Sequence, residues 1–320
     1  MRNFVLDGIM GLCVADTMGV PVEFMDRETL KKDPVVGIRE YGTYNQPAGT
    51  WSDDTSMTLC LVDSISKGLD YEDIMLNFIK WIEEGEYTPY GEAFDSGFTT
   101  RKALMRFKKG VPPLECGGRS EYDNGNGSLM RILPILFYLQ SMYGINFTDV
   151  GGAYEIIHNI SALTHGHKRS QIACGIYISV ASRLIGGMDM KIVVSSGIYQ
   201  AMKFYKGRED YIDELKHFKQ LEREDFAELP EGEIKSNGYV VDTLEAAIWC
   251  LLNTENYKDC VLKAVNLGND TDTVAAVVGG LAGLRYGYES IPQDWVNEIA
   301  RKEYVEDLCN KLYLSLTQNV

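Results

Sequence analysis

The chain has 320 residues, and 46 acidic side chains against 31 basic ones give it a formal net charge of −15. Hydrophobic residues make up 45% and charged residues 24%, which is typical of a folded globular protein and excludes a disordered chain. A chain this acidic is poorly suited to nucleic-acid phosphates or anionic lipid, so we expect no nucleic-acid or membrane partner. The excess carboxylates either form a solvated surface or gather around bound cations.

The cysteines and the first residues favour a cytoplasmic protein. Seven cysteines are dispersed without a Cys-x-x-Cys pair, which favours reduced thiols over a disulfide framework. Residues 1–6 are followed by Asp7, which interrupts the apolar run too early for a secretory signal. No stretch approaches about 18 uninterrupted apolar residues, so we expect no helix that spans a membrane.

The N-terminal region is expected to be a helix with a closely packed face. Small residues at positions 8, 11, 15 and 19 leave room for a neighbouring helix to approach. Asp16 lies on this otherwise apolar segment, so it is either hydrogen-bonded to a neighbouring helix or part of a site. Glu23 follows near Pro21 and, taken alone, is expected on the surface as a loop carboxylate.

Helical periodicity continues through the rest of the chain. Asp70 is a plausible N-cap for a helix with apolar residues at positions 74, 78 and 82. Similar apolar stripes recur at 156–163, 244–251 and 274–284, whereas residues 35–41 form a short strand at most. The sequence therefore predicts an all-α protein of about ten or more helices.

Long or charged segments lie between these helices. Residues 33–50 and 110–128 are rich in Gly, Pro, Asn and aromatic residues, and they are too long to be simple connections between helices. Loops of this length are usually functional or disordered. Residues 206–238 are the most charged region and are expected to be a solvated helical excursion. No Ser- or Pro-rich linker divides the chain, so we expect one domain over residues 1–320.

Two acidic clusters stand directly before predicted helices. The first is the segment 52–55, ahead of a helix expected from Ser56 to about Ser66, where carboxylates can cap free backbone N–H groups. The second is the segment 270–273, where alternate residues can point two carboxylates into one hollow. Oxygen ligands of this kind suit hard cations such as Mg²⁺ or Mn²⁺.

The two clusters offer more acidic side chains than helix capping needs. Four aspartates and two hydroxyls are enough for a two-metal centre if the two helix starts face each other. Capping without a metal is the alternative at this point. The candidate metal ligands are Ser52, Asp53, Asp54, Asp270, Asp272 and Thr273.

A loop rich in Gly and Asn precedes another predicted helix. Bare N–H groups at the positive end of a helix suit a phosphate or diphosphate, although Asn-Gly pairs are also common in ordinary turns. The chain has neither a Gly-x-x-x-x-Gly-Lys-Ser/Thr pattern nor Gly-x-Gly-x-x-Gly after a strand, which disfavours nucleoside-triphosphate and Rossmann sites. The loop residues are Asn124, Gly125, Asn126, Gly127 and Ser128.

His165 and His167 form a His-x-His pattern. Such a pair can bind zinc when further soft ligands are available. None stands nearby in the sequence, so we favour a positioned polar side chain at a helix end as the role of His165.

Taken in this order, the segments resemble the ADP-ribosylglycohydrolase family over nearly the whole chain. The resemblance implies a compact, orthogonal multi-helix bundle with a binuclear Mg²⁺ or Mn²⁺ centre at the base of a cleft. It also implies metal-dependent hydrolysis of the glycosidic bond between ADP-ribose and a modified group, either a protein side chain or a small conjugate. The matching segments are residues 16–23, 52–55, 124–131, 164–165, 238–245 and 268–287.

The resemblance further implies roles for single carboxylates. Both acidic clusters would hold the two cations, and Glu23 matches a flexible glutamate near the metals and the scissile ribose. Cleavage at the ribose passes through an oxocarbenium-like state that needs a nearby water and a proton for the leaving group. Asp53, Asp270 or Glu23 would move that proton, and the sequence does not choose among them.

The substrate-binding residues are likewise implied by the resemblance. Residues 124–128 would cradle the diphosphate, His165 would lie along the ADP-ribose, and Tyr239 would stand near the leaving group. The chain departs mildly from the family pattern, with Ser52 for a threonine and Asn269 for a glycine. Asparagine tolerates the left-handed backbone that glycine adopts, so neither departure removes a metal ligand.

Three other readings stay open at the level of sequence. A catalytically silent ADP-ribose-binding or structural relative would keep the fold without the reaction. Asp270 begins an Asp-x-Asp-x-Thr motif like that of haloacid dehalogenase-type phosphatases, but those enzymes need it at the end of an apolar strand. An isoprenoid synthase would need a further acidic position that residues 53–57 lack.

The acceptor from which ADP-ribose is released is not encoded in a readable motif. Arginine, serine and acetyl linkages differ only in the leaving group, and the Gly-Tyr-Val setting of Tyr239 leans towards arginine. We expect the substrate to be an ADP-ribosylated protein or small conjugate, and the protein to be a monomer.

Overall fold

The regular structure of the protein is helical. The computed structural model describes residues 2–185 and 188–317, and within these ranges no strand occurs. Isolated bridges pair Gly118 with His165 and Gly125 with Tyr239. The predicted all-α class is confirmed, and residues 35–41, which we expected to form a short strand at most, are irregular.

The helices follow one another along the described chain with short 3₁₀ segments between them. The α-helices are α1 (Phe4–Gly19), α2 (Arg27–Lys32), α3 (Asp53–Ile65), α4 (Tyr71–Glu84), α5 (Phe98–Lys108), α6 (Pro134–Tyr143), α7 (Gly151–Ala162), α8 (Lys168–Leu184), α9 (Met190–Lys206), α10 (Val240–Leu252), α11 (Tyr257–Val265), α12 (Thr271–Tyr286), α13 (Gln293–Glu298) and α14 (Lys302–Thr317). The 3₁₀ segments are η1 (Val20–Val22), η2 (Pro113–Glu115), η3 (Glu121–Asp123), η4 (Phe147–Asp149), η5 (Glu209–Glu222), η6 (Phe226–Glu228), η7 (Glu231–Glu233) and η8 (Tyr288–Ser290).

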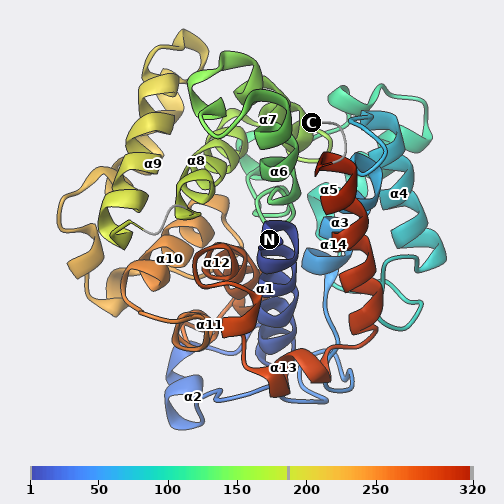
Figure 1. Cartoon of the computed structure of the whole chain (residues 1–320), viewed down its shortest axis with the longest axis vertical. Helices are drawn as coiled ribbons and strands as arrows, with labels where there is room; N and C mark the ends of the chain where they lie inside the picture. Colours follow the sequence, from blue (N-terminus) through green and yellow to red (C-terminus); the bar gives the residue numbers. More distant parts are fainter. Residues whose placement is uncertain (1, 186–187, 318–320) are drawn as a thin grey trace.

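Helices α1 and α12 lie side by side at the centre of the molecule (Figure 1). Their contact is made by the small residues noted in the sequence: a Cβ added to Gly11 would stand 2.5 Å from the carbonyl oxygen of Gly279. A Cβ added to Gly279 would stand 2.3 Å from Cβ of Ala15. The two backbones can approach this closely only because these positions lack larger side chains, as the sequence predicted.

The same central helix is also strongly apolar. The segment Phe4–Val22, which joins α1 to η1, is long and apolar enough to cross a membrane, with a mean hydropathy of 1.5. We expected no such segment, because Asp7 and Asp16 interrupt the apolar run. Within the fold, 94% of this window is buried, as in the central helix of a packed core.

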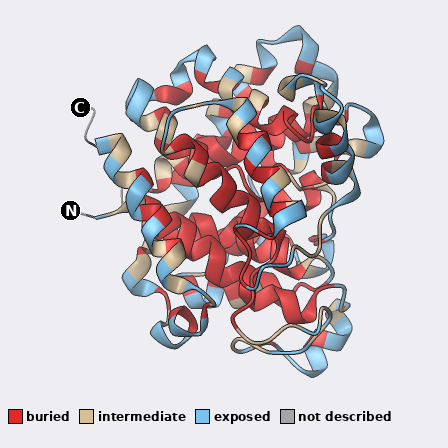
Figure 2. Cartoon of the chain, turned by 90° about the vertical axis from the view of Figure 1, so that its right-hand side faces the viewer, coloured by how far each residue is buried: buried red, intermediate tan, exposed pale blue. Residues whose placement is uncertain are grey.

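The remaining helices bury apolar stripes against this centre, and exposed residues gather at the periphery (Figure 2). Helix α4 follows the predicted pattern: Asp70 accepts hydrogen bonds from the backbone N–H groups of Glu72 and Asp73, and Ile74 and Phe78 are buried. A left-handed glycine, Gly85 with φ 70°, ends the helix. All seven cysteines are free and buried.

The highly charged region 206–238 is less solvated than we expected. Much of it is the 3₁₀ segment η5, which packs on α8 and α9 (Figure 1). Every third or fourth residue of η5 faces inward, so most of its charges occupy the outer face. Glu214 is an exception, because it pairs with the buried Arg169 of α8 at 2.8 Å. The buried side chains are Tyr211, Leu215, Phe218 and Leu221.

Candidate active site

The two acidic helix starts meet at the C-terminal end of α1. A Cβ added to Gly19 would stand 2.3 Å from Cα of Asp272, so the start of α12 lies directly against the end of α1. The hydroxyl of Thr271 donates to the carbonyl oxygen of Gly19 at 2.8 Å. The hydroxyl of Thr273 donates to Asp54 Oδ2 at 3.3 Å, which connects the two clusters directly. The helix starts therefore face each other.

Helix α3 begins at Asp53, three residues before the start that we expected. Asp16 on α1 explains the difference, because its carboxylate accepts from the backbone N–H groups of Ser52 and Thr55 at 3.1 Å each. The hydroxyls of Ser52 and Thr55 donate to the same carboxylate at 2.8 and 2.6 Å. Asp16 thus caps a helix from a distant segment, which is one of its two expected roles, and its carboxylate also lies in the acidic cluster.

The start of α12 is shaped by two left-handed residues, Gly268 with φ 77° and Asn269 with φ 64°. Asn269 donates its backbone N–H to the carbonyl oxygen of Met25 at 2.7 Å and accepts from the N–H of Phe24 at 2.6 Å. The asparagine therefore takes the backbone expected of glycine there, and it ties the second acidic cluster to the segment that carries Glu23.

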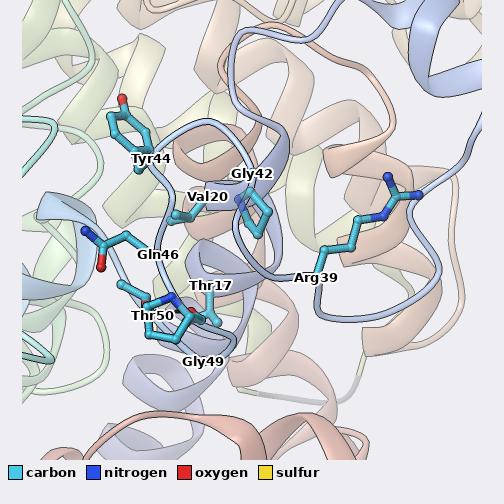
Figure 3. A pocket seen from close by; sticks show the side chains of 10 residues that line it. Thr17, Val20, Arg39, Gly42, Tyr44, Gln46, Gly49 and Thr50 are labelled. Carbon is cyan, nitrogen blue, oxygen red and sulfur yellow. Dashed lines mark hydrogen bonds between the residues drawn. The ribbon is translucent and has the colours of Figure 1, made fainter.

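Glu23 is buried, with 4% of its surface exposed, although we expected a loop carboxylate on the surface. Residues 39–50 cover the end of α1 and η1, where Thr17 and Thr50 line one small pocket beneath the loop that carries Tyr44 (Figure 3). Thr43 of this loop donates its hydroxyl to the carbonyl oxygen of Glu23 at 2.7 Å. Sequence reasoning missed this burial because a loop distant in sequence provides it.

A further carboxylate, Asp95, joins the cluster from the loop between α4 and α5. It accepts a hydrogen bond from the hydroxyl of Tyr44 at 2.5 Å. Its oxygens lie with those of Glu23 and Asp272 in a group whose ligand atoms are all within 4.8 Å of one another. The sequence analysis did not identify Asp95, because no helix start or recognisable motif marks its position.

The carboxylates of this cluster have the arrangement expected of ligands for divalent cations. A second group of ligand atoms within 4.8 Å joins Asp16, Asp54 and Asp272. Three buried oxygens, Glu23 Oε2, Asp54 Oδ1 and Asp272 Oδ2, have no hydrogen-bond partner. In the ranges that the structure describes, no Lys, Arg or His forms an ion pair with these residues. Buried charges without partners are costly, and these oxygen donors suit Mg²⁺ or Mn²⁺.

Burial raises the pKa of every acid in the cluster, and for most of them repulsion by neighbouring carboxylates adds to it. Desolvation is the largest cause throughout, and it raises the pKa of Asp16 and of Asp95 to about 6. Burial, reinforced by the charge of Asp95, raises the pKa of Glu23 to about 9. Such shifts are typical of functional sites. The other acids with a raised pKa are Asp53, Asp54, Asp270 and Asp272.

A cleft of about 330 Å³ opens above the carboxylates. Its acidic end is lined by Glu23, Asp53, Asp95, Asp270 and Thr273, and its other end by Gly125, Asn126, Gly127, His165 and Gly238. Asn126 connects the two ends, because its side-chain amide donates to Asp270 Oδ2 at 2.8 Å and to Thr243 Oγ1 at 2.9 Å. Tyr122, which is 97% exposed, stands among the lining residues.

Three candidate residues lie beside this cleft rather than in it. The side chain of Asn124 donates to the carbonyl oxygen of Glu121 and accepts from Ser170. Ser128 is fully buried, so this residue, like Asn124, could offer a ligand only its backbone. The ring of Tyr239 faces the guanidinium of Arg169, 5.8 Å away. The substrate roles expected for these residues stay predictions.

The chain is similar to known proteins over nearly its whole length. The chain matches the family model described as ADP-ribosylglycohydrolase over residues 1–319. The chain belongs to the ADP-ribosylglycohydrolase family. A solved structure titled as an ADP-ribosylglycohydrolase-related protein complex superimposes with a TM-score of 0.80 at 28% identity, covering 98% of both chains.

Curated relatives of this ADP-ribosylglycohydrolase include two bacterial hydrolases. The ADP-ribosylarginine hydrolase Tri1 of Serratia proteamaculans is 31% identical over 95% of this chain and 77% of its own length. The glycohydrolase of ADP-ribosyl-dinitrogen reductase from Rhodospirillum rubrum is 28% identical over 94% of this chain and 92% of its own. The expected family and its enzyme class, a hydrolase, are confirmed.

The position of the Asp-x-Asp-x-Thr segment excludes the phosphatase alternative. The Asp-x-Asp-x-Thr segment of this ADP-ribosylglycohydrolase lies at the N-terminal end of α12, after α11 and an irregular turn. The motif of such phosphatases follows a strand, and the described ranges contain none. The acidic segment therefore belongs to the helical cluster.

Proposed function

We propose that this enzyme uses two divalent cations, Mg²⁺ or Mn²⁺, to hydrolyse the bond between C1″ of ADP-ribose and a modified group. The observation that carries the proposal is the convergence of seven carboxylates from α1, the residue after η1, α3, the start of α12 and the α4–α5 loop, four of which line one cleft. No protein cation balances them within the described ranges, and three of their buried oxygens lack any partner.

The two helix starts would hold the cations. Their ligand set comprises Ser52, Asp53 and Asp54 from α3 and Asp270, Asp272 and Thr273 from α12. When bound, divalent cations at such a centre orient hydroxyl ligands and make a coordinated water more acidic. Asp16 and Asn126 would hold these ligands in position. Asp16 accepts a hydrogen bond from the N–H of Thr55 on α3, and Asn126 donates one to Asp270.

The remaining chemistry is one substitution at C1″ and one proton transfer. The bond from C1″ to the nitrogen or oxygen of the leaving group breaks, a water oxygen takes its place, and the leaving group receives a proton. Glu23, Asp53 and Asp270 line the cleft and can move that proton. We favour Glu23, because its Oε2 has no hydrogen-bond partner whereas Asp270 Oδ2 accepts from Asn126.

The far end of the cleft suits the diphosphate. Gly125, Asn126 and Gly127 line it, two of them without a side chain, and the ring of His165 lies beside them. In a protein of net charge −15, bound cations and local hydrogen-bond donors would have to attract this anionic part of the substrate.

Arginine is the acceptor that we propose. A relative at 31% identity is named an ADP-ribosylarginine hydrolase. In this chain, Asp95 adds a carboxylate beyond the two metal-ligand clusters, and it lines the cleft. A guanidinium leaving group would be attracted by such charge, whereas a serine hydroxyl or an acetyl group would not.

Release of ADP-ribose from an arginine-modified protein tests the proposal. We expect turnover with Mg²⁺ or Mn²⁺ and none after chelation. Asp272→Asn should lower kcat at least about a hundredfold, since even residues behind a metal ligand can matter by that factor. Asp63→Asn on the same helix as Asp53 serves as control, because Asp63 pairs with Lys311 far from the cleft. Turnover that resists chelation, or full activity of Asp272→Asn, would refute the metal centre.

A further inference from the structure

A fully buried arginine, Arg131, lies behind the diphosphate end of the cleft. Both hydrogens of its Nη2 are used, to the carbonyl oxygen of Ile160 at 3.2 Å and to Thr164 Oγ1 at 2.7 Å. Its guanidinium lies over the ring of Phe78, 4.8 Å from the centroid. Its Nε and Nη1 have no partner, and in the described ranges no carboxylate pairs with it. A buried cation without a charged partner is costly, so we expect Arg131 to have a function that compensates for this cost.

Thr164 connects this arginine to His165. Thr164 Oγ1 lies 2.8 Å from His165 Nδ1, and the threonine is fully buried. Arginine can only donate, so Thr164 must accept from Arg131. The hydroxyl hydrogen of Thr164 then has one available acceptor, Nδ1 of His165. If Nδ1 carried the proton instead, a buried hydroxyl hydrogen would remain without a partner.

The other ring nitrogen of His165 faces the cleft. A Cβ added to Gly125 would stand 3.7 Å from His165 Nε2, and one added to Gly127 would stand 3.4 Å from it. Among the described residues Nε2 has no hydrogen-bond partner, and His165 lines the cleft. The backbone of His165 is fixed as well, because its N–H donates to Ser161 at 2.8 Å and it pairs with Gly118.

We propose that Arg131 and Thr164 fix His165 as the neutral Nε2–H tautomer, so that the imidazole donates a hydrogen bond into the cleft to an anionic oxygen of the ligand. Arg131 and Thr164 are then positioning residues that act through the histidine. The identity of that oxygen as part of a diphosphate rests on the proposed function.

The electrostatics agree with this geometry. Burial, and after it the charge of Arg131, lowers the pKa of His165 to about 3, so the ring is neutral at physiological pH. A neutral imidazole can have its proton on either nitrogen, and the hydrogen bond made by one nitrogen decides which. The contacts of Arg131 and Thr164 therefore give the cleft a hydrogen-bond donor, His165 Nε2–H, that carries no charge.

Nitrogen NMR of protein labelled with ¹⁵N-histidine tests the tautomer directly. The chain has four histidines, and the loss of one signal in His165→Gln assigns the ring. We expect Nε2 to carry the hydrogen and Nδ1 to be bare in the free protein. In Thr164→Val, which keeps the shape but removes the hydroxyl, the ring should populate both tautomers. A protonated Nδ1 in the wild type would overturn the proposal.

Ligand affinity provides the second measurement. Thr164→Val should weaken ADP-ribose binding about twofold, because only the molecules with the Nε2–H tautomer can donate the hydrogen bond, and Thr164→Ser should restore it. Thr58→Val is the matched control, because Thr58 is also fully buried and its hydroxyl has no partner. Unchanged affinity in Thr164→Val would overturn the proposal. A wild type that binds no ADP-ribose would contradict the proposed function, while the ring signals in the free protein would still decide the tautomer.

Discussion

At the scale of single residues, Asp95 differs from the other carboxylates of the site. It lies on a loop with a left-handed backbone, φ 56°, and its carboxylate is held by the hydroxyl of Tyr44 at 2.5 Å. The remaining acids come from helices or their immediate ends. Asp95 therefore adds a carboxylate to the cleft without belonging to either helix start, and under the proposed function it would select the leaving group.

Asp95→Asn tests this role, since it keeps the shape and removes the charge. We expect kcat/KM for arginine-linked ADP-ribose to fall at least about tenfold, because a hydrogen bond to a charged group is lost. A serine-linked substrate, whose leaving group is neutral, should be affected less. Parallel assays of both conjugates measure the difference. Glu92→Gln, an exposed acid of the same loop, is the control, and equal losses on both substrates would contradict the assignment.

The sequence identified those site residues that carry a local signal. Asp53 and Asp270 stand at helix starts, and an acidic residue before an apolar stripe is readable without a structure. Asp95 and Arg131 carry no such signal, because contacts with segments distant in sequence place them beside the cleft. The burial of Glu23 and the early start of α3 were missed for the same reason: residues 39–50 and Asp16 cause them.

At the scale of elements, the contact of α1 with α12 sets the geometry of the acidic cluster. Gly19 lies against Asp272, so a change in the spacing of the two helices moves Asp16 and Glu23 relative to the start of α12. The stripe of small residues was readable in the sequence, whereas its partner helix was not. Packing at this contact and assembly of the site are therefore coupled.

Gly279→Ala probes this coupling at a distance from the carboxylates. The added methyl would stand 2.3 Å from Cβ of Ala15 and 2.5 Å from the carbonyl oxygen of Gly11, so the helices must separate. We expect a loss of about 1–3 kcal/mol in the free energy of unfolding and weaker binding of Mn²⁺, measured by chemical denaturation and calorimetry. Gly232→Ala, where nothing lies within 4 Å, should change neither. Unaltered stability and metal affinity in Gly279→Ala would contradict the coupling.

At the scale of the whole molecule, the acidic side chains fall into two groups. Most acidic side chains are exposed and solvated, as along the outer face of η5. Seven carboxylates instead converge on one cleft, where each bound divalent cation would bring two positive charges. Repulsion among these buried groups opposes folding of the metal-free protein, so its stability should depend on pH in a definite direction.

The raised pKa values set the direction in which the free energy of unfolding changes with pH. Asp16 and Asp95 have a pKa of about 6 in the folded protein and Glu23 of about 9, all above their values in an unfolded chain. Between about pH 4 and pH 9 the folded state therefore binds more protons than the unfolded state, and the free energy of unfolding falls as pH rises. In the presence of a chelator, we expect the Tm to be lower at pH 8.5 than at pH 6.

Divalent cations should reverse this trend. Protons compete with the metal for the same oxygens, so Mg²⁺ or Mn²⁺ binds more tightly as pH rises and stabilises the folded state more. Thermal melts with chelator and with excess metal at each pH measure both effects. In Asp272→Asn, where one charge and one ligand are lost, the fall of Tm in chelator should be smaller and the response to metal weaker. A metal-free Tm that rises with pH would show that these carboxylates do not repel one another in the fold.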